Sequence, residues 1–245
     1  MPAFFITEQD ICDRVVTIGG ALHHHLSHSL RLKPGDTLLL TEAGVRRHRA
    51  RVTTIDRTRL QATIQDSQPR PPRETRPLHL ALAILKHDPM DWVIQKATEL
   101  GVASVQPLIT HRSAVRPEPD RASAQRDRWQ RIAREAAQQS EQWTIPSIHV
   151  PLSLEHWLRP TPLRGQGLVL QERAGAPSLP DVRWASIPTD ITVVVGPEGG
   201  WEAQELKALE QRGYQGASLG APILRAETAA LAAISIVQAH LGHFR

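Results

Sequence analysis

The sequence predicts a two-part protein in which a small β-barrel precedes a parallel α/β domain. Short strand-like segments separated by turn signals fill residues 1–68, which is typical of a small barrel. A stretch rich in proline and arginine at 67–77 then favours a linker. Beyond it, apolar strands alternate with helical patterns, and this alternation predicts a parallel sheet covered by helices. The expected domains are therefore 1–70 and 76–245.

Five segments of the first part have the composition of strands. They are FFIT (4–7), RVVTIG (14–19), DTLLLTE (36–42), RARVTTID (49–56) and RLQATIQD (59–66). Lys-Pro-Gly-Asp at 33–36 is a turn signal between two of them. Residues 1–76 hold 12 Lys/Arg against 8 Asp/Glu, and the surplus is concentrated in 44–60. Such a patch attracts polyanions, and a solvated strand face is the alternative.

The second part begins with LHLALAIL (78–85), a continuous apolar run of the kind that is buried on both faces of a parallel sheet. The further strands expected are 102–110, 167–172, 191–196 and 216–220, and the expected helices are 88–101, 121–141, 201–212 and 226–241. The last helix is apolar nearly all the way round. It must therefore be buried on most sides, and a partner subunit could cover one of them.

Bulk composition describes an ordinary soluble globular protein. The chain has 245 residues, of which 40% are apolar and 22% charged. No run approaches the roughly 20 apolar residues of a membrane span, and the start lacks the pattern of a secretion signal, so we expect a cytoplasmic protein. A single Cys12 excludes an internal disulfide and a cysteine-based zinc site.

Four histidines crowd into residues 23–28, but no cysteine or carboxylate cluster accompanies them. They are His23, His24, His25 and His28. We therefore expect no metal, and a turn or a strand end in this stretch.

Three loops at expected strand ends have the character of a ligand site. They are LQERAG (170–175), VGPEGGW (195–201) and LGAPILRAETA (219–229). The glycines of the second loop allow positive φ and a close approach of the backbone to a ligand. No P-loop or G-x-G-x-x-G pattern is present, and Glu198 inside the turn would repel a phosphate. A cationic ligand or a neutral base fits better, although Glu198 could simply favour a helix N-terminus.

VVVGPEGGW (193–201) followed by LGAPILRAETAALAAIS (219–235) resembles the signature of the SPOUT methyltransferases. Within them the chain resembles the ribosomal small-subunit methyltransferase E family, which methylates N3 of a uridine in 16S ribosomal RNA. The resemblance runs nearly end to end. It includes HHHLSHSLRLKPGD (23–36), LKHDPMDWVIQKATELGV (85–102), THRSAV (110–115) and REAAQQSEQWTIP (134–146).

This resemblance implies a PUA-like β-barrel at 1–70, a SPOUT α/β domain with a deep trefoil knot at 76–245, and a homodimer. It also implies S-adenosylmethionine as methyl donor, bound within 165–245. The implied cofactor residues are Leu170, Gly196, Pro197, Glu198, Gly199, Gly200, Leu219, Gly220, Leu224 and Thr228. We expect a Cβ at Gly199 or Gly200 to occupy ligand space or to force a costly φ.

The expected substrate is 16S ribosomal RNA within the 30S subunit. The expected RNA contacts are Arg31, Arg46, Arg47, Arg49 and Lys86, and a salt-bridged surface is the alternative for Lys86. Uracil N3 carries a proton and is a poor nucleophile until that proton leaves, so a cation should stabilise the uracil anion. Arg225 is the candidate, with Arg112 as a helper, and the sequence identifies no general base. An ion pair with Glu227 that orients the loop is the alternative role of Arg225.

Three positions of this chain depart from the pattern that is usual in this family. They are Ala3, Gln142 and Pro222, where charged residues are usual, and we expect them to affect RNA docking but not the cofactor loops. They keep open the hypothesis of a SPOUT methyltransferase for another RNA such as transfer RNA. A third hypothesis is a non-catalytic RNA-binding protein in which the glycine turns are only structural.

Overall fold

The computed structural model describes residues 2–72, 76–118, 120–159, 163, 165–172, 175–184 and 190–244. The chain forms two compact units. Residues 1–73 and 137–145 make up the first, and residues 74–136 and 146–245 make up the second. The segment 137–145 therefore belongs with the first unit, which the division expected from the sequence does not include. None of the described helices is long and apolar enough to cross a membrane.

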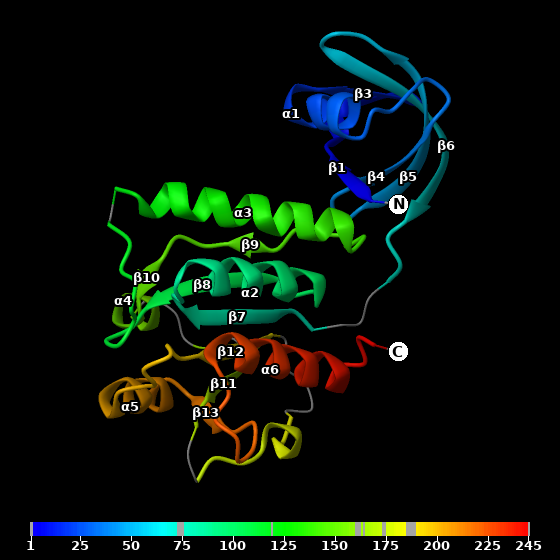
Figure 1. Ribbon diagram of the computed structural model, residues 1–245. Coiled ribbons are helices and arrows are strands. Elements are labelled where there is room, and N and C mark those ends of the chain that lie inside the picture. The colour runs from blue at the N-terminus through cyan, green and yellow to red at the C-terminus, as the bar shows by residue number, and fades with distance from the viewer. Residues whose placement is uncertain are drawn as a thin grey trace. The chain divides into compact units, whose positions relative to one another are not determined.

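The first unit is built on a six-stranded sheet with the order β1-β4-β5-β6-β3-β2, blue to cyan in Figure 1. Its strands are β1 (Ala3–Ile6), β2 (Ile11–Cys12), β3 (Val15–Gly19), β4 (Thr37–Glu42), β5 (Arg46–Ile55) and β6 (Arg59–Pro69). β1 pairs with β4 in parallel, and the remaining pairs are antiparallel. Burial alternates along β5 and β6, so one face of the sheet forms a core and the other is exposed.

A helical segment follows β3, where we expected a turn or a strand end. α1 (Gly20–His24) continues directly into a π-helical turn, η2 (His25–Ser29). Gly20 has a φ of +61°, which allows the chain to leave the strand and enter the helix. Leu22 and Leu26, four residues apart, pack against the core of this unit. That spacing is typical of a helix, but a single leucine pair among four histidines is too short a pattern to predict one. A short 3-10 helix, η1 (Glu8–Asp10), precedes β2.

The second unit is built on a seven-stranded sheet with the order β10-β8-β7-β12-β11-β13, and β9 pairs with β8. Its strands are β7 (Leu78–Ala83), β8 (Ser104–Ile109), β9 (Ser147–Ile148), β10 (Leu152–Ser153), β11 (Gln166–Leu170), β12 (Ile191–Val195) and β13 (Tyr214–Ala217). Each described pair is parallel. β7, β11 and β12 are buried almost throughout, as their continuous apolar sequences predict.

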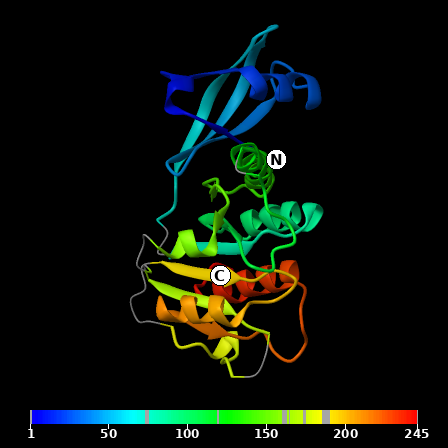
Figure 2. The ribbon, with the colours of Figure 1, turned by 90° about the vertical axis from the view of Figure 1, so that its left-hand side faces the viewer.

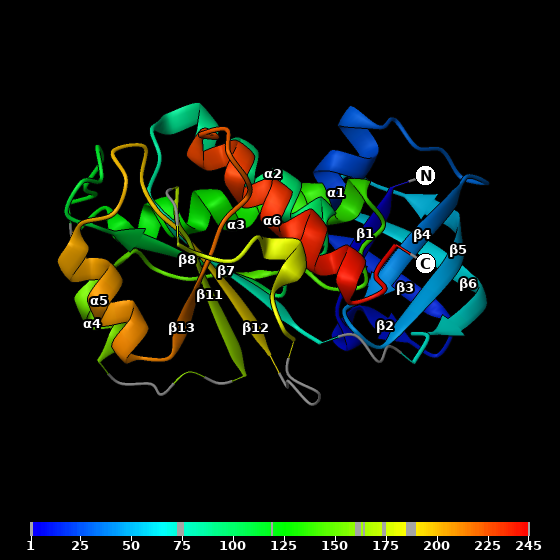
Figure 3. The same cartoon turned by 90° about the horizontal axis from the view of Figure 1, so that it is seen from below.

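Helices cover both faces of this sheet. They are α2 (His87–Glu99), α3 (Ala122–Gln139), α4 (Leu154–Leu158), α5 (Ala203–Gln211) and α6 (Ala226–His240), with a 3-10 turn η3 (Leu179–Asp181). α2 and α6 lie side by side, and α6 packs on β7 and β12. α5 and α6 lie on opposite faces of the sheet (Figure 2 and Figure 3), and α4 and α5 share a core with Tyr214 and Leu209. The predicted mixed α/β architecture is confirmed at this level.

α6 is less completely covered than its sequence suggested. Ala230, Ala233, Ile234 and Val237 form a fully buried stripe at helical spacing. Other apolar residues of the helix, such as Leu231 and Ile236, remain partly exposed in the single chain. One chain therefore covers one side of this helix well and the others only in part.

Candidate active site

A cleft of about 940 Å³ opens at the carboxyl edge of the second sheet. β7 and β12 are neighbours in the middle of the sheet. From β7 the sheet continues through β8 to one edge, and from β12 it continues through β11 and β13 to the other edge. Ligands of open α/β sheets gather at such a point, because the loops on either side turn away from each other. The residues that line the cleft are Lys86, Pro89, Arg112, 170–172, 195–201, Leu206, 219–220, 222–227 and Ala229.

The structure brings most of the sequence-predicted site residues together in this cleft. The cofactor candidates line it with the exception of Thr228, which is exposed on the first turn of α6. Arg112, Arg225 and Lys86 line it as well. Residues that the sequence did not single out also contribute, among them Gln171, Trp201 and Leu206. Their only signal was their position within or beside the three glycine-containing loops.

Gly196 is required by the indole ring of Trp201. A Cβ at position 196 would lie 2.8 Å from Cε2 and 2.9 Å from Nε1 of that ring. The same Nε1 donates a hydrogen bond of 2.9 Å to the carbonyl oxygen of Leu170. The ring therefore ties the turn after β12 to the loop after β11, and glycine provides the space in which it lies.

Gly200 and Gly199 have different roles in the same turn. Gly200 has a φ of +73°, and its amide donates to the carbonyl oxygen of Pro197 at 2.9 Å, so this position favours glycine for conformational reasons. At Gly199 the contact that the structure shows is with a side chain. An added Cβ would approach the Cβ of Arg112 at 3.2 Å, so Arg112 would have to move slightly.

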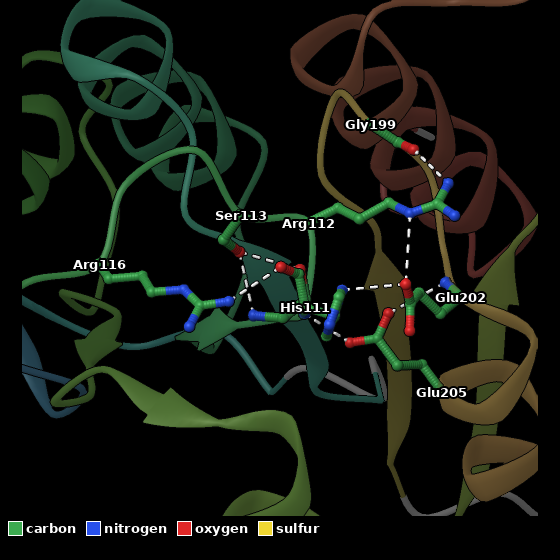
Figure 4. Close-up of polar contacts among 8 residues, drawn as sticks. His111, Arg112, Ser113, Arg116, Gly199, Glu202 and Glu205 are labelled. Carbon is green, nitrogen blue, oxygen red and sulfur yellow. Dashed lines mark hydrogen bonds and ion pairs between the residues drawn. The ribbon is translucent and has the colours of Figure 1, made fainter.

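The loop after β8 holds the far side of the turn through polar contacts (Figure 4). Arg112 Nη1 donates to the carbonyl oxygen of Gly199 at 3.0 Å, and its Nε lies 3.7 Å from Glu202 Oε1. His111 Nδ1 lies 2.9 Å from the same carboxylate oxygen. Glu205 Oε1 accepts from the backbone amide of His111 at 2.9 Å. Two residues of one loop are thus bound to the start of α5.

The third wall of the cleft comes from the loop that connects β13 to α6. Ser218 Oγ accepts from the amide of Gly220 at 3.2 Å, and Gly220 has a φ of +105°. Pro222 lines the cleft, so this departure from the family pattern does touch the cofactor loops, against our expectation. Arg225 is the N-cap residue of α6 and is exposed. Among the described residues no ion pair joins it to Glu227, so the loop-orienting alternative gains no support.

The charges around the cleft are mixed. Glu198 and Glu172 are exposed and Glu227 is half-buried, and each lines the cleft. Within the described part of the chain, no ion pair involves any of these three carboxylates. On the opposing side, the charge of Arg112 is offset by Glu202, whereas Lys86 and Arg225 form no ion pair with a described residue. The turn after β12 therefore offers a carboxylate and backbone groups, and its own residues include no cation.

Burial shifts the pKa of two groups on the second sheet, Tyr214 and His79. Burial raises the pKa of Tyr214 to about 12. Burial also lowers the pKa of His79, against the opposing effect of Asp190, whose Oδ2 lies 3.8 Å from His79 Nε2 at the other end of the sheet. No set of three or more metal-binding side chains is grouped in the described residues.

The arginines of the first unit are not equivalent. Arg46 and Arg49 on β5 are exposed, and Arg31 is exposed with a φ of +54°. Arg47 instead binds within its unit, where its Nη2 donates to the carbonyl oxygen of Glu141 at 2.7 Å and its guanidinium lies 4.3 Å from the ring centroid of Trp143. Burial lowers the pKa of Arg47, against the raising effect of Glu141. Arg47 therefore anchors the segment 137–145 and differs from its exposed neighbours.

Known proteins with the same features identify the family. A family model described as an RNA methyltransferase domain matches residues 72–238. The ribosomal RNA small subunit methyltransferase E of Synechocystis sp. is 31% identical over 96% of this chain and 77% of its own length. The protein of the same name from Rickettsia conorii is 32% identical over 88% of this chain and 85% of its own. The chain belongs to the ribosomal RNA small subunit methyltransferase E family.

A solved structure extends this likeness to three dimensions. The ribosomal RNA small subunit methyltransferase E of Neisseria gonorrhoeae, crystallised with S-adenosyl methionine, matches with a TM-score of 0.87 and 32% identity over 98% of each chain. The likeness therefore includes both units. It also confirms the family that the glycine turn and the loop before α6 indicated in the sequence.

Proposed function

We propose that this methyltransferase E family member transfers the methyl group of S-adenosylmethionine to N3 of a uridine in 16S ribosomal RNA of the 30S subunit. The observation that carries the proposal is the cleft at the carboxyl edge of β7, β12 and β11, with the glycine turn as one wall. Family membership supplies the reaction class, and the geometry of the cleft supports the residue roles that we propose.

The residues of the cleft fit a cofactor of this kind. Its volume of about 940 Å³ lies within the range of small-molecule sites, roughly 300 to 1,000 Å³. Leu170, Leu219 and Leu224 offer apolar contact to an adenine ring, and the turn 196–200 offers backbone groups. Glu198 in that turn favours a positively charged sulfonium over a phosphate. When bound, the cofactor supplies an activated methyl group on sulfur.

Arg225 is the residue we assign to the uracil. Deprotonated N3 leaves negative charge on the ring, and an exposed guanidinium at the rim of the cleft stabilises that charge. Arg225 also precedes the first turn of α6, whose free amide groups favour an anion. Arg112, the second cation predicted from the sequence, already contacts Gly199 and Glu202, so we assign this role to Arg225 alone.

The proton of N3 needs an acceptor within the cleft. Glu172, Glu198 and Glu227 are the carboxylates among its described lining residues, and each could accept a proton directly or through water. An in-line displacement depends mainly on how well the reacting groups are positioned, and we assign this positioning to the residues that line the cleft.

RNA docking is the role we assign to the first unit. Arg31, Arg46 and Arg49 are exposed and can each contact a phosphate, whereas Arg47 positions 137–145. Lys86, exposed at the rim of the cleft, is suited to the RNA near the target base.

The finer architecture is part of the same proposal. The first unit would be a PUA-like barrel, and the second a SPOUT domain whose chain is tied in a trefoil knot. The partly exposed apolar side of α6, together with the exposed Trp92 on the neighbouring α2, favours a homodimer through this domain. Such an enzyme would work in the cytoplasm, where its ribosomal substrate lies.

Two measurements test the proposed function. Calorimetry with S-adenosylmethionine and S-adenosylhomocysteine should give a saturable signal with one site per chain. Labelled methyl donor is then supplied with 30S subunits, naked 16S RNA and bulk transfer RNA in parallel. We expect label in the 30S reaction. Label in transfer RNA alone would establish the alternative target, and the absence of any cofactor binding would favour a non-catalytic RNA-binding protein.

A further inference from the structure

One carboxylate joins the loop after β8 to the start of α5, directly beside the glycine turn (Figure 4). Glu202 Oε1 lies 2.9 Å from His111 Nδ1 and 3.7 Å from Arg112 Nε. Two residues of one loop therefore lie against the same carboxylate, which stands one residue after the turn.

The position of Glu202 is itself fixed by the helix that it begins. It is the N-cap residue of α5, and its backbone amide donates to Glu205 Oε2 at 3.1 Å in a reciprocal capping box. The other oxygen of Glu205 accepts from the backbone amide of His111 at 2.9 Å. The loop is also internally fixed, since Ser113 Oγ accepts from the amide of Thr110 at 3.0 Å.

Arg112 connects this fixed carboxylate to the turn. Its Nη1 donates to the carbonyl oxygen of Gly199 at 3.0 Å while its Nε faces Glu202. A planar guanidinium can hold two acceptors in a set geometry, which an ammonium group on a flexible stem cannot do equally well. Gly199 and Gly200 make the turn intrinsically mobile, because glycine loses more conformational freedom on ordering than any other residue.

We propose that Glu202 and Arg112 form a clamp that holds the turn 196–201 in the shape that receives the cofactor. The clamp deepens the proposed function and rests on it. Its members are positioning residues, because they act on the turn rather than on the reacting atoms. Ordering the turn in advance removes part of the entropy cost of binding, so the clamp contributes to cofactor affinity. It should contribute little to kcat, because contacts equal in ground and transition states raise affinity alone.

The test is a double-mutant cycle read out by cofactor affinity. The variants are Arg112→Ala, Glu202→Ser and their combination, each titrated with S-adenosylhomocysteine by calorimetry. Serine at 202 keeps an oxygen that can cap α5 and removes the carboxylate that reaches Arg112. Each single variant should weaken binding about tenfold. This loss lies at the lower end of the free energies of charge-assisted hydrogen bonds, because both groups are partly exposed to solvent. The double variant should bind about as weakly as either single variant, because the two residues act in series.

Three comparisons make the result specific. Glu210→Gln changes an exposed carboxylate on α5 that does not line the cleft, and it should bind normally. Arg112→Lys should not restore affinity. Melting without ligand checks that each variant folds, and steady-state kinetics should show a raised KM for the methyl donor with kcat nearly unchanged.

Unchanged affinity in the Arg112→Ala variant would overturn the clamp. So would single losses that multiply in the double variant to about a hundredfold, because they would show independent effects. A fall in kcat with normal affinity would also overturn it and would return Arg112 to the role of catalytic helper. Failure of the wild-type chain to bind cofactor at all would be a separate result, which rejects the proposed function and the clamp with it.

Discussion

Replacing Gly196 by alanine adds a single methyl group at the most crowded point of the glycine turn. The new Cβ would lie 2.8 Å from Cε2 and 2.9 Å from Nε1 of Trp201, closer than carbon atoms in proteins approach one another. The ring cannot rotate away freely, because its Nε1 donates to the carbonyl oxygen of Leu170. Relief of the clash therefore requires the ring to move and this hydrogen bond to break or lengthen.

The magnitude follows from two contributions. Forcing an extra carbon into a packed region costs about 1 to 3 kcal/mol. Loss of one neutral hydrogen bond costs about 0.5 to 1.5 kcal/mol more. We expect the free energy of unfolding of Gly196→Ala to fall by about 1.5 to 4.5 kcal/mol. Cofactor affinity should fall as well, because the ring joins two of the loops that form the cleft.

Chemical denaturation with and without S-adenosylhomocysteine measures both effects. Gly19→Ala is the matched control, since its Cβ would meet only an ordinary contact of 3.8 Å on an extended backbone. In a Trp201→Leu background the indole is absent, and Gly196→Ala should then cost less than about 1 kcal/mol. An equal loss in both backgrounds would refute the reasoning, because the ring would then not be the cause.

Three further outcomes are expected. Changing Arg46 and Arg49 together to alanine should weaken RNA binding and reduce the slope of log K against log salt concentration by up to about 1.8 units, as binding assays over a salt series would show. Changing Arg47 to alanine should instead lower the melting temperature, because this side chain binds the segment 137–145. Arg225→Ala should lower kcat on 30S subunits by about tenfold or more while cofactor binding and melting stay normal, and unchanged turnover would exclude the role given to this residue. Burial raises the pKa of Tyr214, the single tyrosine, to about 12 in the folded chain. In the unfolded chain this hydroxyl loses its proton near pH 10, so the free energy of unfolding should fall as the pH rises from about 10 towards 12. Ultraviolet titration of tyrosinate, checked by circular dichroism, should show no ionisation near pH 10 while the chain is folded.

Local patterns were sufficient to predict the parts of the fold that depend on local physics. The apolar runs at 78–85 and 191–196 have no polar face to turn to solvent, so they had to be central strands, and they became β7 and β12. Parallel strands end at one edge, which is why the three glycine-containing loops of the sequence meet in one cleft. The candidate cofactor residues were therefore brought together largely as expected.

Contacts between distant segments could not be predicted in the same way. Arg47 and Trp143 are far apart in the sequence, and nothing near either residue indicates that they meet. Glycine is needed at 196 because the indole ring of Trp201 packs against it. The contact of Gly199 with Arg112 depends on the loop after β8, which is distant in the sequence. The contacts of Glu202 and Glu205 with the loop after β8 could not be predicted either, because a capping pattern in the sequence does not indicate which neighbouring loop will bind to it.

Mapping the methylated nucleotide tests the central claim most directly. Undermethylated 30S subunits are incubated with the protein and labelled S-adenosylmethionine, and the 16S RNA is digested and analysed by mass spectrometry against a 3-methyluridine standard. The account predicts one labelled nucleotide in 16S RNA, identified as 3-methyluridine, and a lower rate of its labelling in the Arg225→Ala reaction. A label on another atom or base, at several scattered positions, or only in transfer RNA would contradict it.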